Sequence, residues 1–135
     1  VTGVQTCALP IYNTVDEVCD RFKPHFENAL GVEVEDYNNC YVHAFQHGDS
    51  SWAHQDYMDY SAIVYLNPTS NWDLRKWGGE TLFFNDELDF CRAMTTPKGG
   101  SAVVFRGDIF HKVTAVSWEA EYPRNSATFF FNKKK

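Results

Sequence analysis

The stretch Trp52-Ala53-His54-Gln55-Asp56 has an imidazole and a carboxylate two residues apart. On an extended backbone, two such side chains point to the same face of a sheet. A second imidazole, that of His111, follows far downstream. If His111 reaches the same face from another strand, the three side chains form a two-histidine, one-carboxylate metal site. Such distant ligands meet only in a closed or double-sheet arrangement, and we therefore expect a jelly roll.

A second His-x-Asp pattern, His47-Gly48-Asp49, makes the motif weak evidence on its own. This copy lies in residues 46–51, whose Gly, Asp and Ser residues are typical of a turn. Because turn residues have no fixed inward face, we expect His54 and Asp56 to be the ligands. The alternative for His111 is a hydrogen-bonded histidine of the core.

Arg124 and Ser126 lie on the last β-rich segment of the chain. An arginine presents a planar fork that binds a carboxylate in bidentate fashion. The triad leaves three positions of an Fe(II) octahedron open for substrate and oxygen. Triad and fork together predict an iron oxygenase that consumes a 2-oxo acid. In the alternative interpretation, Arg124 is a surface partner of Glu119 or Glu121.

The segments on both sides of this stretch are rich in β-forming residues. Residues 61–67 form the clearest core strand, in which Ile63 and Tyr65 share one face while Ala62 and Val64 share the other. The other segments with strand signals are residues 32–35, 40–45, 78–84, 101–105, 109–113 and 124–132. One helix followed by about eight short strands is typical of a β-sandwich or barrel.

The helix is expected at residues 14–30. Thr14-Val15-Asp16-Glu17 has the form of a capping box, and apolar residues from Val15 to Leu30 follow the helical period. We expect this helix to pack on the outside of a sheet. Residues 85–96 show no such pattern and are expected to form an irregular connection.

The composition indicates one domain of 135 residues with a single buried core. The net charge of −6 disfavours, without excluding, a nucleic-acid partner, and the three terminal lysines are expected to be a solvated end.

The four cysteines have no zinc or CxxC spacing, which favours free thiols in a reducing cytoplasm. No apolar run approaches transmembrane length and no signal-peptide pattern appears, so we expect a cytoplasmic location without a membrane partner. The oligomeric state stays open.

The first eleven residues, VTGVQTCALPI, resemble the translation of a sequencing-adaptor oligonucleotide. We therefore expect residues 1–11 to be a non-native segment. On this hypothesis, residues 12–135 are an oxygenase domain that lacks part of its N-terminus. The alternative is a genuine N-terminal strand.

Several further motifs follow in a familiar order. The set consists of His54-Gln55-Asp56, Tyr65-Leu66-Asn67, Gly78-Gly79-Glu80-Thr81, residues 97–105 (PKGGSAVVF), His111 and Arg124-Asn125-Ser126. Over residues 40–132, it resembles the Fe(II)- and 2-oxoglutarate-dependent oxygenases, specifically the prolyl 4-hydroxylase-like branch. The resemblance implies a mainly β fold, a double-stranded β-helix of the jelly-roll or cupin type with the N-terminal helix packed outside.

The resemblance also implies roles for individual residues. Arg124 would pair with the distal carboxylate of 2-oxoglutarate, and Ser126 on the same strand face would offer it a hydroxyl. Tyr65 would place a phenol near that carboxylate, although it could equally pack in the core. Phe45 stands where related hydroxylases can have a tyrosine, and a phenyl ring donates no hydrogen bond. The implied Fe(II) ligands are His54, Asp56 and His111.

The implied reaction hydroxylates an unidentified substrate and releases succinate and CO2 from 2-oxoglutarate and O2, with ascorbate as a further candidate cofactor. The substrate could be a peptidyl proline, another side chain, a small metabolite or a nucleobase. Asp56 fills the position that a halide would need, which favours hydroxylation over halogenation. One alternative is a cupin-type metalloenzyme that does not use 2-oxoglutarate, and another is a non-catalytic jelly-roll binding module without Fe(II) affinity.

Overall fold

The computed structural model describes residues 2–37, 39–67 and 72–135, with side chains from residue 16 onward. Within these residues, one helix precedes seven strands. The elements are α1 (Thr2–Leu30), β1 (Asn39–Phe45), β2 (Tyr60–Tyr65), β3 (Thr81–Phe84), β4 (Cys91–Thr95), β5 (Ala102–Arg106), β6 (His111–Val113) and β7 (Arg124–Phe131). No helix in the described ranges is long and apolar enough to cross a membrane.

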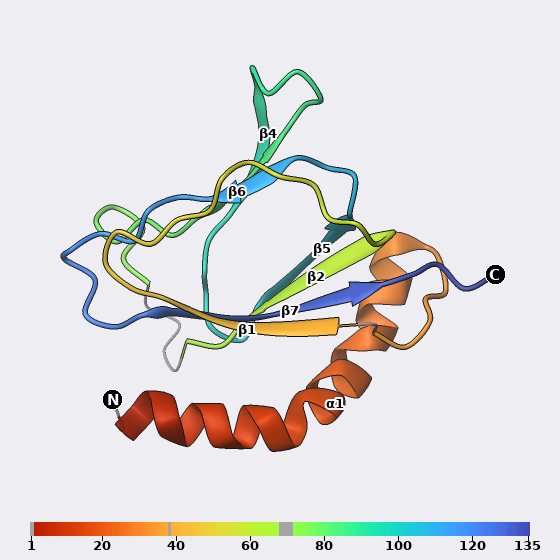
Figure 1. Ribbon diagram of the computed structural model, residues 1–135, viewed down its shortest axis with the longest axis horizontal. Helices are drawn as coiled ribbons and strands as arrows, with labels where there is room; N and C mark the ends of the chain where they lie inside the picture. The colour runs from red at the N-terminus through yellow and green to blue at the C-terminus, as the bar shows by residue number, and fades with distance from the viewer. Residues whose placement is uncertain (1, 38, 68–71) are drawn as a thin grey trace.

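The strands form two antiparallel sheets that face each other (Figure 1). The four-stranded sheet has the order β1-β7-β2-β5, and the three-stranded sheet has the order β4-β3-β6. A further antiparallel bridge joins His54 to His111, so that the His-x-Asp segment lies beside β6. The expectation of a mainly β, double-stranded β-helix with a helix on the outside is confirmed.

Helix α1 packs against the outer face of the four-stranded sheet (Figure 1). Phe26 on the helix and Phe131 on β7 meet edge to face at 6.2 Å between ring centroids. Alternate residues of β2, Ala62 and Val64, belong to the same apolar cluster. Burying each large side chain here contributes about 1.5–3 kcal/mol, which explains why the helix docks on this face.

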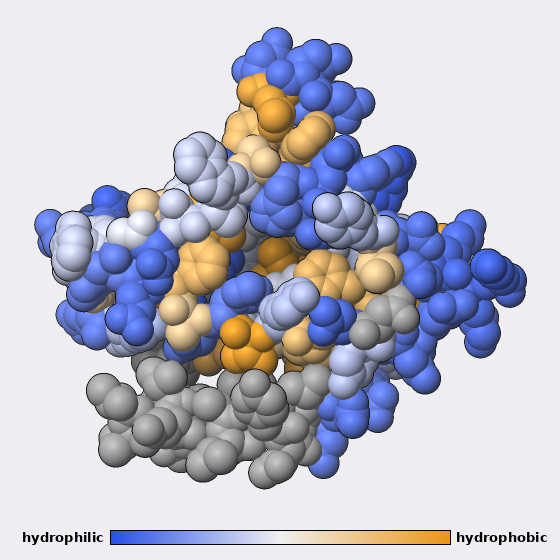
Figure 2. Space-filling view, in the orientation of Figure 1, coloured by the Kyte–Doolittle hydropathy of each residue, from blue (hydrophilic) through white to orange (hydrophobic). Residues whose placement is uncertain are grey.

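The opposite face of β2 points between the sheets, as its alternation predicted. Ile63 and Tyr65 form a second buried cluster with Phe83 of β3 and Phe105 of β5. Figure 2 shows apolar side chains within a hollow of the face that exposes the gap between the two sheets. The candidate site therefore lies against the inner face of the four-stranded sheet.

The expected helix start at residue 14 is wrong. Helix α1 begins at Thr2, so residues 14–17 lie inside it. A capping box marks a helix start only where its first residue leaves the helical conformation, and here that residue is helical. The expected end is confirmed, because Gly31 has a φ of +67° directly after the helix.

Two strand expectations are also wrong. Residues 85–96 contain β4, which pairs with β3 but is mostly exposed, so its sequence has no apolar face to reveal it. Residues 32–35 form no strand and contribute only a single bridge from Val34 to Lys133. The sequence also predicts a turn at Asn38-Asn39. Asn38 lies outside the described residues, and Asn39 begins β1.

Candidate metal centre

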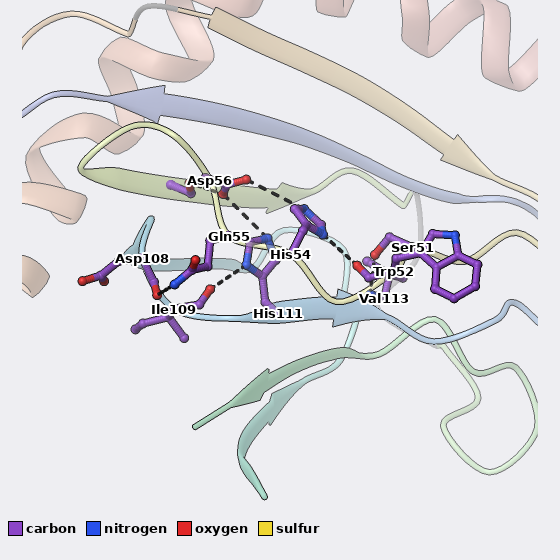
Figure 3. Close-up of polar contacts among 10 residues, drawn as sticks. Ser51, Trp52, His54, Gln55, Asp56, Asp108, Ile109, His111 and Val113 are labelled. Carbon is purple, nitrogen blue, oxygen red and sulfur yellow. Dashed lines mark hydrogen bonds and ion pairs between the residues drawn. The ribbon is translucent and has the colours of Figure 1, made fainter. Parts of the chain in front are cut away.

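Three side chains converge between the sheets. His54, Asp56 and His111 each offer one ligand atom, and these atoms lie within 4.8 Å of one another (Figure 3). The Nε2 atom of His54 is 3.8 Å from Asp56 Oδ1, and the Nε2 atom of His111 is 3.6 Å from Asp56 Oδ2. The structure thus brings together the three residues that the sequence singled out.

Backbone hydrogen bonds hold the two histidines side by side. The His54 amide donates to the His111 carbonyl at 3.0 Å, and the His111 amide donates back at 2.9 Å. The ring centroids consequently lie 4.4 Å apart. Asp56 is fixed in the same way, since its amide donates to the Gly107 carbonyl at 2.8 Å. These bonds position the triad before any ligand arrives.

Both imidazoles have one nitrogen engaged by a main-chain carbonyl. His54 Nδ1 lies 2.7 Å from the Trp52 oxygen, and His111 Nδ1 lies 2.9 Å from the Ile109 oxygen. A carbonyl only accepts, so each Nδ1 is assigned the proton and each Nε2 keeps a lone pair. Burial lowers the pKa of His111, which favours its neutral form. Neutral imidazole with the second nitrogen held in this way is typical of metal-ligating histidines.

Ser61 supports the carboxylate and was not predicted from the sequence. Its hydroxyl donates to Asp56 Oδ2 at 2.5 Å. Ser61 is the second residue of β2 and shares a face with Ile63, so the alternation of this strand could have identified it as an inward polar residue. Such hydrogen bonds orient ligating carboxylates.

The site is buried on one side and open on the other. The side chains of His111 and Asp56 are 6% and 10% exposed, whereas that of His54 is 47% exposed. The neighbouring Trp52 is 92% exposed, and its indole points away from the triad (Figure 3). The open side of the site is therefore the side of His54.

The second His-x-Asp pattern lies in a turn, as the sequence indicated. His47 Nε2 is 3.0 Å from the Ala120 carbonyl oxygen, and its ring centroid lies 5.2 Å from that of Trp118, with the two rings tilted by 41°. Asp49 accepts a hydrogen bond from the amide of Gln46 at 2.8 Å. Neither residue belongs to the cluster around His111.

Arg124 is only 2% exposed, so it is not the surface partner of Glu119 or Glu121. Its Nε donates to the Gly79 carbonyl at 2.8 Å, while Nη1 and Nη2 donate to the Ser126 and Thr81 hydroxyls at 3.2 and 3.1 Å. Within the described ranges, no carboxylate forms an ion pair with it. Burial lowers the pKa of Arg124, yet a guanidinium stays protonated at neutral pH. The inner face therefore holds a buried cation without an anion.

Two aromatic rings flank this guanidinium. The Cζ atom of Arg124 lies 5.3 Å from the ring centre of Tyr65 and 5.5 Å from that of Phe45. The Tyr65 hydroxyl is engaged with Thr81 at 3.0 Å and with Thr95 at 2.7 Å. Tyr65 thus packs beneath the guanidinium, with its hydroxyl turned toward the three-stranded sheet.

A cavity of about 110 Å³ joins the triad to the guanidinium. It is lined by His43, Phe45, Ser51, His54, Asp56, Ile63, His111, Val113, Arg124, Ser126, Thr128 and Phe130. Tyr65 does not line it. A larger hollow of about 510 Å³ lies over β3, β4 and β5, but it contains none of the triad. The smaller cavity is the candidate site because, of the two, it is lined by both the His-Asp-His triad and Arg124.

The family model described as the 2OG-Fe(II) oxygenase superfamily matches residues 18–132. The chain belongs to this superfamily. The crystal structure of a Pseudomonas putida prolyl-4-hydroxylase is similar, with a TM-score of 0.65 and 23% identity, over 86% of this chain and 62% of that one. A 2OG-Fe(II) oxygenase family oxidoreductase from Burkholderia pseudomallei gives a TM-score of 0.69 and 18% identity, over 89% and 55%. No curated protein sequence matches.

These likenesses show a shared fold, and the chain spans little more than half of each of the two structures. In this member of the superfamily, the side chains at the site fit the Fe(II) and 2-oxoglutarate that the family name implies. Two lone-pair nitrogens and a carboxylate suit Fe(II). The guanidinium of Arg124 donates to three protein oxygens and has no carboxylate partner among the described residues, which suits it to a carboxylate ligand.

Proposed function

We propose that this chain is the catalytic domain of an Fe(II)- and 2-oxoglutarate-dependent dioxygenase that hydroxylates a substrate and releases succinate and CO2. The observation that supports this most is the shared cavity, where the triad and the unpaired guanidinium of Arg124 line the same space. A buried cation without an anion is unfavourable, and a cosubstrate carboxylate would relieve it.

His54, Asp56 and His111 would hold the metal. Each imidazole would bind through Nε2, because its Nδ1 is committed to a main-chain carbonyl. Asp56 would bind through a carboxylate oxygen while Ser61 holds Oδ2. When bound, Fe(II) would activate O2, the oxidant; 2-oxoglutarate would supply two electrons and leave as succinate and CO2, while one oxygen atom of O2 enters a C–H bond of the substrate.

Arg124 and Ser126 would bind the distal carboxylate of the cosubstrate. The planar fork of a guanidinium matches the two oxygens of a carboxylate. The Ser126 oxygen accepts from Arg124 and keeps its own proton to donate. Tyr65 would support the guanidinium: its ring face lies against Arg124, and its hydrogen bond to that side chain raises the pKa of Arg124, opposing the effect of burial.

Aromatic rings pack against His111. The ring centroid of Phe105 lies 4.7 Å from that of His111, and the ring centroid of Phe83 lies 6.2 Å from that of His111. The exposed side of His54 leaves room for the substrate. The likeness to a prolyl-4-hydroxylase structure supports a peptidyl proline as the first substrate class to test.

The alternatives account for less of the site. A cupin-type metalloenzyme without 2-oxoglutarate would use the triad but would leave the buried charge of Arg124 unexplained. A non-catalytic binding module would need neither the triad nor the carbonyl-held imidazoles. Both are distinguished from the proposal by turnover of 2-oxoglutarate.

The test measures Fe(II) affinity and succinate formation in the wild type and in two variants. Asp56→Ala should lose more affinity for Fe(II) than the 10–100-fold typical of an outer-shell change, because a direct ligand is gone. Succinate formation should stop with it. The matched control is Asp49→Asn in the other His-x-Asp pattern, which should keep both. If Asp56→Ala retained full Fe(II) affinity and turnover, the proposed ligand set would be wrong.

A further inference from the structure

The inner face of the four-stranded sheet contains a polar residue without an assigned role, His43. Strand β1 places His43 directly opposite Ser126 of β7, and Ser126 in turn lies opposite Tyr65 of β2. Residues opposite one another on neighbouring strands have side chains on the same face, with Cβ atoms about 4.5–5.5 Å apart. His43 therefore stands in the same row as the serine that holds Arg124.

The His43 ring borders the candidate cavity. It lies between Tyr41 and Phe45, at 6.0 and 5.6 Å between ring centroids. Within the described part of the chain, neither ring nitrogen of His43 has a hydrogen-bond partner. Every fully buried side-chain nitrogen or oxygen in that part does have a partner, so the nitrogens of His43 are not fully buried. The nitrogens of His43 are thus reachable by a small molecule.

Electrostatics keeps this histidine neutral. Burial lowers the pKa of His43, and the positive charge of Arg124 lowers it further. A neutral imidazole has one N–H to donate and one lone pair. His43 is therefore a single hydrogen-bond donor beside a cation that has no anion.

Phe45, the residue of β1 opposite Arg124, has no hydrogen-bond donor in its side chain. Phe45 lies opposite Arg124 and presents only its ring to the guanidinium. It cannot donate to a carboxylate bound there. His43, two residues earlier on the same strand face, is the nearest residue of β1 that can.

We propose that the His43 ring N–H donates a hydrogen bond to the distal carboxylate of 2-oxoglutarate, beside the Arg124 fork and the Ser126 hydroxyl. This inference rests on the proposed function. It makes His43 a cosubstrate-binding residue that supplies from β1 the contact that Phe45 cannot make.

The test compares two 2-oxo acids by anaerobic calorimetric titration of the Mn(II)-loaded protein. 2-Oxoglutarate has the distal carboxylate, and 2-oxobutyrate lacks it. His43→Phe should weaken 2-oxoglutarate binding roughly 10- to 100-fold, as expected for one hydrogen bond to a charged group, and leave 2-oxobutyrate binding unchanged. His43→Gln, which keeps an N–H donor, should recover part of the loss, and the control Tyr41→Phe on the same strand should bind both acids like the wild type.

Each contrary outcome has a separate meaning. Unchanged 2-oxoglutarate affinity in His43→Phe would overturn the role of His43 while leaving the proposed function intact. An equal loss for both acids would show that His43 acts only through packing, which also overturns the inference. A wild-type protein that binds Mn(II) but not 2-oxoglutarate would overturn the proposed function, and the His43 role with it.

Discussion

Replacing Arg124 with methionine should strongly weaken 2-oxoglutarate binding without unfolding the protein. The variant loses the guanidinium that lines the cavity, and each of the two hydrogen bonds that it would donate to a carboxylate is worth about 1.5–3 kcal/mol. The loss is therefore about 3–6 kcal/mol, or roughly 10²- to 10⁴-fold in affinity. Arg124→Lys should recover only part of it, because an ammonium is a point charge without the planar fork.

The stability of the ligand-free variant separates binding from folding. Methionine forfeits the hydrogen bonds to Gly79, Thr81 and Ser126, but it also removes a buried cation that has no carboxylate partner in the described residues. These effects oppose each other, so we expect the free energy of unfolding to change by less than about 2 kcal/mol.

Thermal unfolding in the presence of Mn(II), with and without 2-oxoglutarate, is the assay. At 100 times its Kd for the wild type, 2-oxoglutarate should stabilise the wild type by about 2.7 kcal/mol and Arg124→Met by at most about 0.4 kcal/mol at the same concentration. Mn(II) alone should stabilise both proteins equally. A variant that 2-oxoglutarate stabilises as much as the wild type would refute the assignment of Arg124.

Three further results are expected. Ser61→Ala should weaken Fe(II) binding about 10- to 100-fold, less than removal of Asp56 itself, as direct titration would show. Gly107→Ala should destabilise the protein in chemical denaturation and also weaken Fe(II) binding, because its Cβ would lie 1.9 Å from a main-chain oxygen of the loop after Asp56. The metal-free protein should lose stability as the pH falls below about 6.5, the pKa of an unfolded histidine. Burial lowers the pKa of both His43 and His111, so the unfolded chain binds more protons in that range; equal denaturation midpoints at pH 7.5 and 5.5 would contradict this.

The sequence predicted the elements whose patterns reflect burial. The alternation in β2 correctly separated the face that meets α1 from the face that meets Phe105, because both faces are buried by different partners. The His-x-Asp spacing likewise identified the side chains that converge with His111. Strand β4 was not predicted because it lies at the edge of the three-stranded sheet and most of its side chains are exposed.

Supporting contacts were harder to foresee than the ligands themselves. Ser61 was not predicted although its strand was, because a serine near the start of a strand is common without any role at a site. The roles of the Trp52 and Ile109 carbonyls depend on backbone geometry and leave no trace in residue identity. His43 acquires its meaning only from the register of β1 against β7, which places it opposite Ser126.

The most direct test of the central claim is an anaerobic crystal structure with Fe(II) and 2-oxoglutarate added. We predict one metal ion at about 2.0–2.2 Å from Nε2 of His54, Nε2 of His111 and a carboxylate oxygen of Asp56. The distal carboxylate of the cosubstrate should meet the guanidinium of Arg124. A metal ion bound at His47 and Asp49, or a cosubstrate that leaves Arg124 without a carboxylate, would contradict the account.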